Sequence, residues 1–278
     1  MTDEETVRSR ESWGAAAAGW EAQRERVWAA SAPVGEAIVA ALDPQPGQTL
    51  LELAAGPGDT GFTAALLLGP AGLLISSDLA PEMVDAARRR GAELGLENVE
   101  YRVLDAQALD LPDGSIDGIL CRWGYMLMPD PLQALRETRR VLRDGGRLSF
   151  AVWGPRGRNR WATAIGRSLL AVGLMEPPDP LAPGMFALAD TGRLADLIVT
   201  AGFEPPAIAE VVVSWRYDSF DEYVEVQTSL SRDLRSRLEE LDAAARTQVL
   251  EATREQLQPY ANDAGYTIDG VSLVVSAS

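Results

Sequence analysis

Short apolar runs alternate with amphipathic stretches through the middle of the chain, between Thr49 and Trp153. The runs predict buried strands, and stretches with apolar positions three and four residues apart predict helices. Strands are expected at residues 50–53, 72–77, 99–104, 116–121 and 147–153, with helices at residues 60–68, 81–94 and 131–142. Such alternation predicts a parallel sheet with right-handed crossovers, whose ligand crevice lies at the carboxyl ends of the strands.

The segments on either side of this alternation predict additional helices. Residues 11–30 are rich in alanine and glutamate, and the spacing of Trp13, Trp20 and Trp28 places all three on one helix face. That face either packs on the core or belongs to a lid over the site. Two further strands, at residues 208–215 and 270–276, enclose an insertion of about 45 residues. In it, leucines 234, 238 and 241 predict one helix, and Asp242 can cap another that ends near Leu257.

These boundaries divide the chain into four parts. Residues 1–45 form an N-terminal helical lid, and residues 46–153 form the core. Residues 154–207 supply a helix, a long loop from Glu176 to Met185 over the site, and a helix at residues 191–201. Residues 208–278 hold the final strands and a helical cap at about 219–264, which is a candidate cap or dimer surface. With 278 residues and 46% apolar content, the chain can bury a substantial core.

A glycine-rich turn follows the first predicted strand. Residues 50–61 read LLELAAGPGDTG, with Gly56, Gly58 and Gly61 just before a helix. Glycine allows a sharp turn and close approach of a ligand, and the helix that follows presents unpaired N–H groups. Asp78 comes about 20 residues later at the next strand end, where a carboxylate can accept hydrogen bonds from ribose hydroxyls. The third strand ends in residues 105–107 (DAQ), where a carboxylate or amide can meet an adenine amine.

Four stretches resemble motifs of the class I S-adenosylmethionine-dependent methyltransferases, in particular the small-molecule branch that includes ubiquinone and menaquinone C-methyltransferases. They are residues 51–58 (LELAAGPG), 77–83 (SDLAPEM), 105–117 (DAQALDLPDGSID) and 134–147 (ALRETRRVLRDGGR). The resemblance covers about residues 48–153. It implies an α/β, Rossmann-like sheet of seven mostly parallel strands with helices on both faces. It also implies methyl transfer from S-adenosylmethionine to a small organic molecule.

The resemblance and the strand ends together give the expected site residues. The cofactor is expected at Glu52, Ala54, Gly56, Gly58, Asp78, Leu79, Met83, Asp105, Ala106, Gln107, Cys121 and Arg122. An apolar or aromatic acceptor is expected among Trp20, Trp123, Tyr125, Met126, Trp153, Arg160, Trp161, Met185 and Phe186. Tyr125 and Arg122 are the candidate catalytic residues. The sequence leaves open whether oxygen, nitrogen or carbon receives the methyl group.

Composition excludes several kinds of chemistry. The chain has no histidine, and all 25 basic residues are arginines. A lysine Schiff base, a Walker lysine and a Ser-His-Asp triad are therefore excluded, and one cysteine cannot build a zinc site. No metal is expected, although a magnesium ion held by carboxylates stays open. Two rival classes also stay open, an NAD(P)-dependent oxidoreductase and a catalytically inactive cofactor-binding partner subunit, but a dehydrogenase usually needs a histidine or a lysine-tuned tyrosine.

Charge and hydropathy indicate the location and the partners. The net charge of −16 would repel nucleic acid and acidic membrane surfaces. No apolar run approaches the roughly 18 residues of a membrane span, and the acidic N-terminus has no signal-peptide core. We expect a cytoplasmic protein that binds a small-molecule acceptor and no nucleic acid, with a homodimer as a further option.

Overall fold

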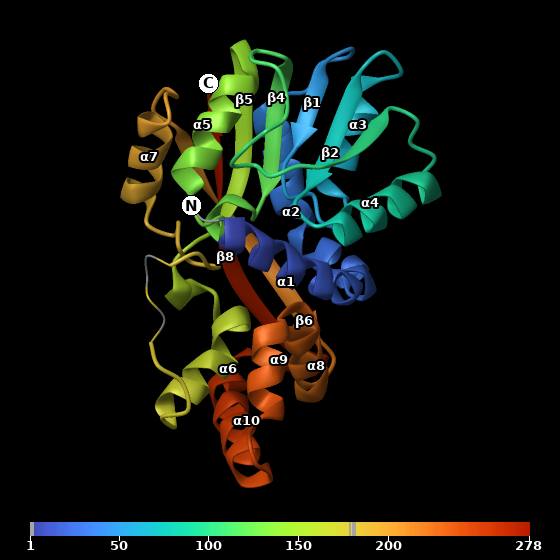
Figure 1. Ribbon diagram of the computed structural model, residues 1–278. Helices are drawn as coiled ribbons and strands as arrows, with labels where there is room; N and C mark the ends of the chain where they lie inside the picture. Colours follow the sequence, from blue (N-terminus) through green and yellow to red (C-terminus); the bar gives the residue numbers. More distant parts are fainter. Residues whose placement is uncertain (1–2, 178, 180–181) are drawn as a thin grey trace.

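The computed structural model describes residues 3–177, 179 and 182–278. Its centre is a sheet in the order β3-β2-β1-β4-β5-β8-β6, with the short strand β7 paired to β8 (Figure 1). The strands are β1 (Thr49–Glu52), β2 (Leu73–Asp78), β3 (Val99–Val103), β4 (Ile116–Arg122), β5 (Leu142–Trp153), β6 (Ala207–Tyr217), β7 (Ala261–Asn262) and β8 (Gly265–Ala277).

The strand directions confirm the predicted fold class. β1 to β5 are parallel to one another, whereas β8 is antiparallel to both β5 and β6. The seven strands of the main path form the expected Rossmann-like, mostly parallel sheet. The two-residue strand β7, which the sequence pattern does not predict, adds an eighth. Because β6 runs in the same direction as β5, the carboxyl ends of β1 to β6 lie at one edge of the sheet.

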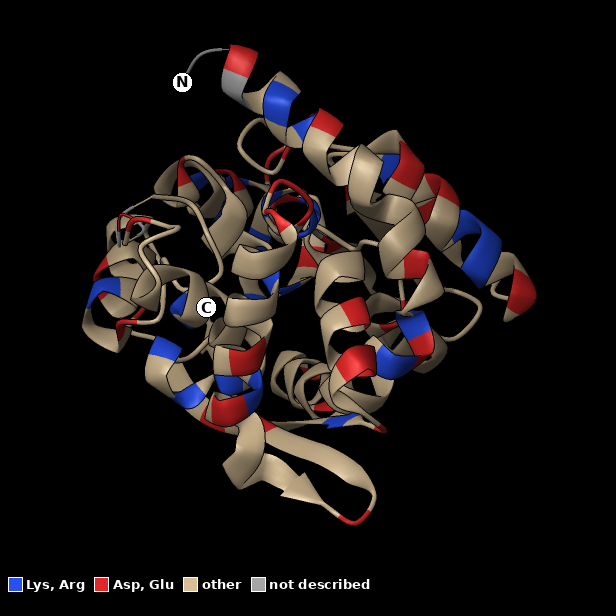
Figure 2. Cartoon of the chain, turned by 90° about the horizontal axis from the view of Figure 1, so that it is seen from below, with Lys and Arg blue, Asp and Glu red and all other residues tan. Residues whose placement is uncertain are grey.

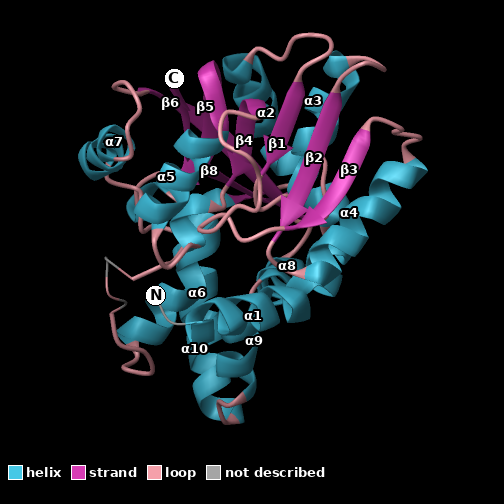
Figure 3. Ribbon diagram, turned by 45° about the horizontal axis from the view of Figure 1, so that its top comes forward, coloured by secondary structure: helices cyan, strands magenta, loops and turns pink. Residues whose placement is uncertain are grey.

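Helices cover both faces of the sheet. α2 packs against β4, β5, β6 and β8 on one face, and α5 lies with α7 on the other (Figures 1 and 3). The helices are α1 (Asp3–Ala22), α2 (Arg24–Leu42), α3 (Thr60–Leu68), α4 (Pro81–Glu93), α5 (Pro131–Val141), α6 (Arg160–Ala171), α7 (Thr191–Thr200), α8 (Phe220–Leu230), α9 (Arg232–Glu239) and α10 (Ala243–Leu257). Single 3-10 turns lie at Tyr125–Leu127, Arg156–Arg158 and Gln258–Tyr260.

The N-terminal region is two helices rather than one. The chain leaves helical geometry at Gln23, so Trp13 and Trp20 belong to α1 whereas Trp28 belongs to α2. The prediction that all three share one helix face is therefore wrong, since a periodic pattern does not show a break at a single residue. α2 has buried side chains along its length, among them Val34 and Ile38. In Figure 1, α1 lies across the carboxyl ends of the strands.

The cap beyond the carboxyl ends of the strands is helical, as the sequence predicts. α9 and α10 occupy the expected insertion, and the side chain of Asp242 caps α10 by accepting a hydrogen bond from Ala245 N at 2.8 Å. α8 precedes them and is not indicated by the leucine pattern. α10 packs on α6, so the insertion joins the segment that follows β5 (Figure 1).

Charged residues of both signs are distributed over the helices (Figure 2). Some of them connect elements: Arg89 of α4 donates to Glu21 of α1 at 2.9 Å. No helix in the described part of the chain is both long and apolar enough to cross a membrane.

Candidate functional site

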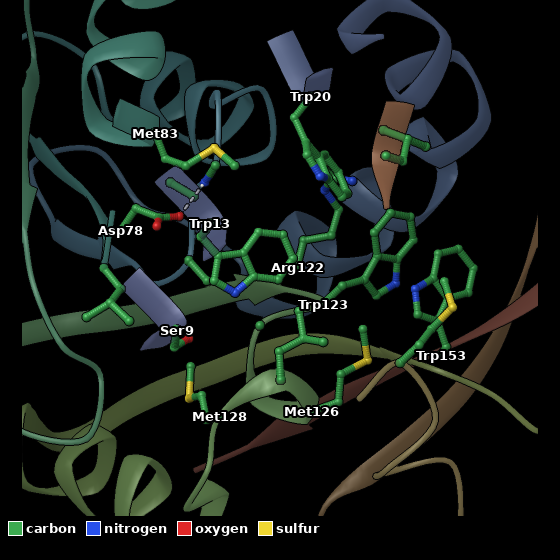
Figure 4. A pocket seen from close by; sticks show the side chains of 18 of the residues that line it. Ser9, Trp13, Trp20, Asp78, Met83, Arg122, Trp123, Met126, Met128 and Trp153 are labelled. Carbon is green, nitrogen blue, oxygen red and sulfur yellow. Dashed lines mark hydrogen bonds between the residues drawn. The ribbon is translucent and has the colours of Figure 1, made fainter. Parts of the chain in front are cut away.

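A cavity of about 410 Å³ lies at the carboxyl edge of the sheet, between the strand ends, α1 and the cap. Its volume falls in the range of small-molecule sites, roughly 300–1,000 Å³. In Figure 4, Asp78 and Met83 lie on one side of the cavity and Trp153 on the other, with Arg122 and Trp123 between them. One continuous cavity therefore joins a polar end to an aromatic end.

Glu52 holds the glycine turn in place from below. Its carboxylate accepts a hydrogen bond from Gly61 N at 2.8 Å and another from Ser76 Oγ at 3.3 Å. A Cβ on Gly61 would overlap this carboxylate, which explains the glycine there. Burial raises the pKa of Glu52 to about 7, opposed by the Gly61 hydrogen bond and by the charge of Arg122. Glu52 does not line the cavity, so it acts on the shape of the turn.

Asp78 lines the cavity at the end of β2. Its Oδ2 accepts from Gly56 N at 2.9 Å, and its Oδ1 accepts from Ala80 N at 3.0 Å. The backbone N–H of Leu79 also donates to this carboxylate. A carboxylate has about four acceptor positions, so Asp78 keeps the capacity to accept from a hydroxyl group of a ligand. Burial raises the pKa of Asp78, and the hydrogen bonds from Ala80 and Gly56 oppose that rise.

Asp105 and Gln107 form a linked polar pair after β3. Asp105 Oδ1 accepts from the backbone N–H and from the side-chain amide of Gln107, at 2.9 and 3.2 Å. Gln107 Oε1 in turn accepts from Asp130 N at 2.9 Å, which fixes the orientation of its amide. Both residues line the cavity, so the pair presents a defined set of donors and acceptors to a ligand.

Two non-glycine residues that line the cavity have left-handed backbone. Ala54, next to the glycine turn, has φ +51°, and Trp123, after β4, has φ +62°. Such values are unusual for alanine and strained for a bulky side chain. Backbone strain is concentrated at binding and catalytic sites, because the surrounding structure must hold it in place. Neither position is marked by a glycine in the sequence.

Arg122 brings a positive charge to the middle of the cavity. Its Nε donates to Thr60 Oγ1 at 2.8 Å and its Nη1 to Ser31 Oγ at 3.2 Å. Its guanidinium carbon lies 4.8 Å from the centre of the Trp123 ring. Burial lowers its pKa, and the charges of Asp59 and Glu52 oppose that shift. Asp59 and Glu52 attract Arg122 without an ion pair among the described residues, so its charge can also attract a negatively polarised ligand atom.

Four tryptophans form a continuous wall at the other end. The rings of Trp123 and Trp153 stack with centres 4.0 Å apart, and those of Trp161 and Trp215 stack at 4.2 Å. Trp153 and Trp161 join the two stacks at 4.9 Å. All four line the cavity, together with Met126.

The helix α1 forms the roof over the polar end. Trp13 and Trp20 line the cavity and contact each other edge to face, with centres 6.3 Å apart. They pack with Met83 of α4. Trp28 does not line the cavity. Of the three tryptophans considered for the lid, two are thus placed over the site.

Most of the expected site residues come together in this cavity. From the cofactor set, the lining contains Ala54, Gly56, Asp78, Leu79, Met83, Asp105, Ala106, Gln107 and Arg122. From the acceptor set, it contains Trp20, Trp123, Met126, Trp153, Trp161 and Met185. The predicted loop Glu176 to Met185 includes residues 178, 180 and 181, which lie outside the described residues. Near its end, Gly184 N donates to Met126 O at 2.9 Å.

The structure does not bring two of the expected residues in and after β4 to the cavity. Cys121 is buried inside the sheet, where burial raises the pKa of its thiol to about 12. The Tyr125 hydroxyl is buried against Thr138 Oγ1 at 2.6 Å, on the side of α5. These placements correct the expectation that Tyr125, a candidate catalytic residue, faces the ligand.

Four other expected residues also lie off the cavity. Glu52 and Gly58 support the glycine turn, and a Cβ on Gly58 would overlap the Phe62 ring. Arg160 starts α6 without lining the cavity, and the ring of Phe186 packs under Arg156, 5.0 Å from its guanidinium carbon.

The cap contributes lining residues that the sequence reasoning missed. They are Trp215 at the end of β6, and Gln227, Leu230, Ser231 and Leu234 of the segment from α8 to α9. Trp215 carries a usable signal, because it ends a predicted strand just as Trp153 does. The α8 and α9 residues have no such signal, since only the tertiary fold brings them to the strand ends.

Comparison with known proteins identifies the central part of the chain. Residues 53–150 match the family described as methyltransferase domain. Residues 53–150 are therefore a methyltransferase domain of the class I S-adenosylmethionine-dependent type. The chain is 37% identical over 103 residues to the ubiquinone/menaquinone biosynthesis C-methyltransferase UbiE of Hahella chejuensis, covering 37% of the chain and 41% of that protein. It is 31% identical over 180 residues to nocamycin O-methyltransferase of Saccharothrix syringae, covering 62% of the chain and 64% of that protein.

The chain spans less than two thirds of the length of either relative. Among solved structures, it is similar to the YcgJ protein of Bacillus subtilis, with a TM-score of 0.58 and 19% identity over 87% of this chain and 96% of that one. That likeness concerns the fold. The family match ends before the aromatic wall is complete, because Trp153, Trp161 and Trp215 follow residue 150.

Proposed function

We propose that the chain transfers a methyl group from S-adenosylmethionine to a small, apolar or aromatic organic acceptor, at oxygen, nitrogen or carbon. The observation that carries the proposal is the continuous cavity between the glycine turn and the tryptophan wall. One end has the carboxylates and amides that suit a nucleoside, and the other has the rings that suit an apolar molecule.

The polar end fits S-adenosylmethionine. Gly56 has φ +57° and open space where a Cβ would lie, so a ligand can approach the backbone there. Asp78 would accept a hydrogen bond from a ribose hydroxyl with its remaining acceptor capacity, and Asp105 with Gln107 would meet the adenine. When bound, the cofactor supplies an electrophilic methyl group on a sulfonium.

The protein's contribution would be positioning. The described lining residues that carry charge are Asp78, Asp105 and Arg122, and the two acids are at the strand ends assigned to the cofactor. Arg122 would orient a negatively polarised oxygen of the acceptor, since no carboxylate of the described residues forms an ion pair with it. α1 would exclude water by covering the cavity with Trp13 and Trp20. Alignment of reactants alone supplies up to roughly 7–11 kcal/mol of rate enhancement.

Two measurements test this function. Isothermal titration should show binding of S-adenosylhomocysteine and none of NAD. A screen of small aromatic and aliphatic acceptors with methyl-labelled S-adenosylmethionine should then find label transfer. Binding of NAD in place of S-adenosylhomocysteine would favour the oxidoreductase. Tight cofactor binding with no transfer to any acceptor would favour the inactive partner subunit.

A further inference from the structure

The aromatic end of the cavity is shaped for flat molecules. The stack of Trp123 on Trp153 and the stack of Trp161 on Trp215 are nearly parallel within each pair, with ring planes 22° and 21° apart. Each of these four rings is at most 6% exposed. Aromatic rings favour offset-stacked or edge contacts with other rings. Rigid walls of this kind suit a planar fused-ring system better than a flexible chain.

Two of the indole N–H groups of this wall have partners within the fold. Trp123 Nε1 donates to Ser272 Oγ at 3.0 Å, and Trp161 Nε1 donates to Asn159 Oδ1 at 3.2 Å. Asn159 is itself fully buried and also binds the backbone of Val271. These two donors therefore fix the orientation of their rings and are not available to a ligand.

Trp215 differs from these two tryptophans. Its ring is 1% exposed and lines the cavity, yet its Nε1 is buried with no hydrogen-bond partner among the described residues. A buried donor without a partner costs about 1–3 kcal/mol, so such groups usually have a role. Because the nitrogen itself is closed off in this structure, a small shift of the Trp215 ring would open it to the cavity, and a ligand oxygen there would supply the missing acceptor.

Gln227 of α8 adds a second polar atom to the same end. It lines the cavity, and its Nε2 donates to the Tyr217 hydroxyl at 3.1 Å. Because this bond turns the amide nitrogen of Gln227 toward Tyr217, the amide oxygen can accept a hydrogen bond from a donor on a ligand. No carboxylate from the described lining residues belongs to this end, because Asp78 and Asp105 are at the ends of β2 and β3. A positively charged acceptor would therefore find no counter-charge here.

We propose that the aromatic end binds a planar, uncharged fused-ring molecule whose carbonyl or hydroxyl oxygen accepts a hydrogen bond from Trp215 Nε1. This inference rests on the proposed function, because it names the class of acceptor for the same site. Trp215 is then a specificity-determining residue, which selects oxygenated rings over plain hydrocarbons. The Gln227 oxygen completes the selection when the acceptor oxygen carries a hydrogen.

A matched pair of probes tests this proposal. 2-Acetylnaphthalene carries a carbonyl, and 2-isopropenylnaphthalene has the same flat shape with a CH₂ group in place of the oxygen. Affinity for each is measured by titration into the full chain saturated with S-adenosylhomocysteine. We expect the ketone to bind more tightly than the alkene. In Trp215→Phe both probes lose some packing against the smaller ring, but the ketone should lose about fivefold more affinity than the alkene, the effect of one net hydrogen bond. Trp28→Phe, outside the cavity, should bind both probes as the wild type does.

Each outcome decides the proposal. Without a hydrogen-bond donor, the cavity would bind the more hydrophobic alkene more tightly than the ketone. Tighter binding of the alkene by the wild type would therefore overturn the hydrogen bond. This comparison needs no variant, so it stands even if Trp215→Phe does not fold. Equal losses for both probes in Trp215→Phe would reduce Trp215 to a packing residue. Absence of binding by either probe to the S-adenosylhomocysteine complex overturns the acceptor class. Failure of S-adenosylhomocysteine itself to bind would instead contradict the proposed function. The titration with S-adenosylhomocysteine, which comes before the probes are added, detects that failure separately.

Discussion

Asp78 Oδ2 accepts a hydrogen bond from Gly56 N at 2.9 Å, although the two residues lie 22 positions apart in the chain. The bond ties the end of β2 to the glycine turn after β1, and both residues line the cavity. One carboxylate therefore organises the turn and faces the ligand. Changes at Asp78 should affect ligand binding more than folding, because the sheet beneath is held by many other contacts.

Replacement of Asp78 by asparagine should weaken binding of S-adenosylhomocysteine by about 1.5–3 kcal/mol, the range for hydrogen bonds to a charged group. Asparagine keeps the shape but presents one acceptor oxygen instead of two. Isothermal titration gives the affinity. The matched control is Asp110→Asn, an exposed position outside the cavity. Unchanged affinity in Asp78→Asn would remove Asp78 from the cofactor site.

Two glycines of the same turn should respond differently to substitution. At Gly56 a side chain meets open space, so Gly56→Val should fold, with a backbone strain of about 1–2 kcal/mol. The valine side chain should fill part of the cavity and lower the affinity for the cofactor by at least about tenfold. At Gly58 a Cβ would overlap the Phe62 ring, so Gly58→Ala should lower the unfolding free energy, by about 1–3 kcal/mol or more. Thermal unfolding and titration of both variants separate the two effects. Normal binding by folded Gly56→Val would make that glycine structural only.

The lid should be separable from the core at Gln23. Deletion of residues 1–22 removes α1 but leaves α2, whose side chains are buried against the sheet. Turnover should fall by at least about tenfold, because water enters the cavity, while the melting temperature changes little. A shortened chain that does not fold would show that Trp13 and Trp20 serve core packing instead.

A point substitution tests the lid without deletion. A Cβ on Gly19 would overlap the backbone of Ser229 in α8, so Gly19→Leu should displace α1 from the cap. Ala18 is exposed one position earlier, so Ala18→Leu is the matched control. Acceptor turnover should fall in Gly19→Leu alone. Equal activities in the two variants would contradict closure of α1 against α8.

The sequence predicted the sheet and the polar end of the cavity better than the aromatic end. Asp78 and Gly56 belong to local patterns, in which a strand, a turn and a helix follow one another. Trp215 and Gln227 reach the cavity only because β6 lies next to β8 and α8 folds back over the strand ends. The sequence pattern also did not show which way the side chains after β4 point. There, Trp123 has a left-handed backbone conformation and precedes a 3-10 turn, and the Tyr125 hydroxyl faces Thr138.

Stability should fall as the pH rises from about 4.5 to 7, in part through Glu52. Its pKa is about 7 in the folded protein and near 4.5 when exposed, so over this range the unfolded chain ionises first. The folded state loses up to about 3 kcal/mol of relative stability by pH 8, since a tenfold difference in proton affinity corresponds to roughly 1.4 kcal/mol. Glu52→Gln keeps an acceptor for Gly61 N but cannot ionise. Urea unfolding at pH 5 and pH 8 should show a smaller loss of stability in the variant, and equal losses would contradict the raised pKa.

Turnover should depend on pH through the acceptor's own ionisation. The described lining residues include no tyrosine or cysteine, and Asp78 and Asp105 lie at the strand ends that we assign to the cofactor. Arg122→Gln should slow methyl transfer by about 10–10³-fold through misplacement of the acceptor, since a shift of about 1 Å can cost roughly 10²-fold.

Tyr125→Phe loses only the hydrogen bond to Thr138, so it should lower the melting temperature and leave the rate of the folded enzyme unchanged. Rates with two acceptors of different pKa, measured across pH for both variants, check these expectations. A tyrosine whose removal abolished transfer while cofactor affinity stayed intact would establish a general base and overturn catalysis by positioning alone.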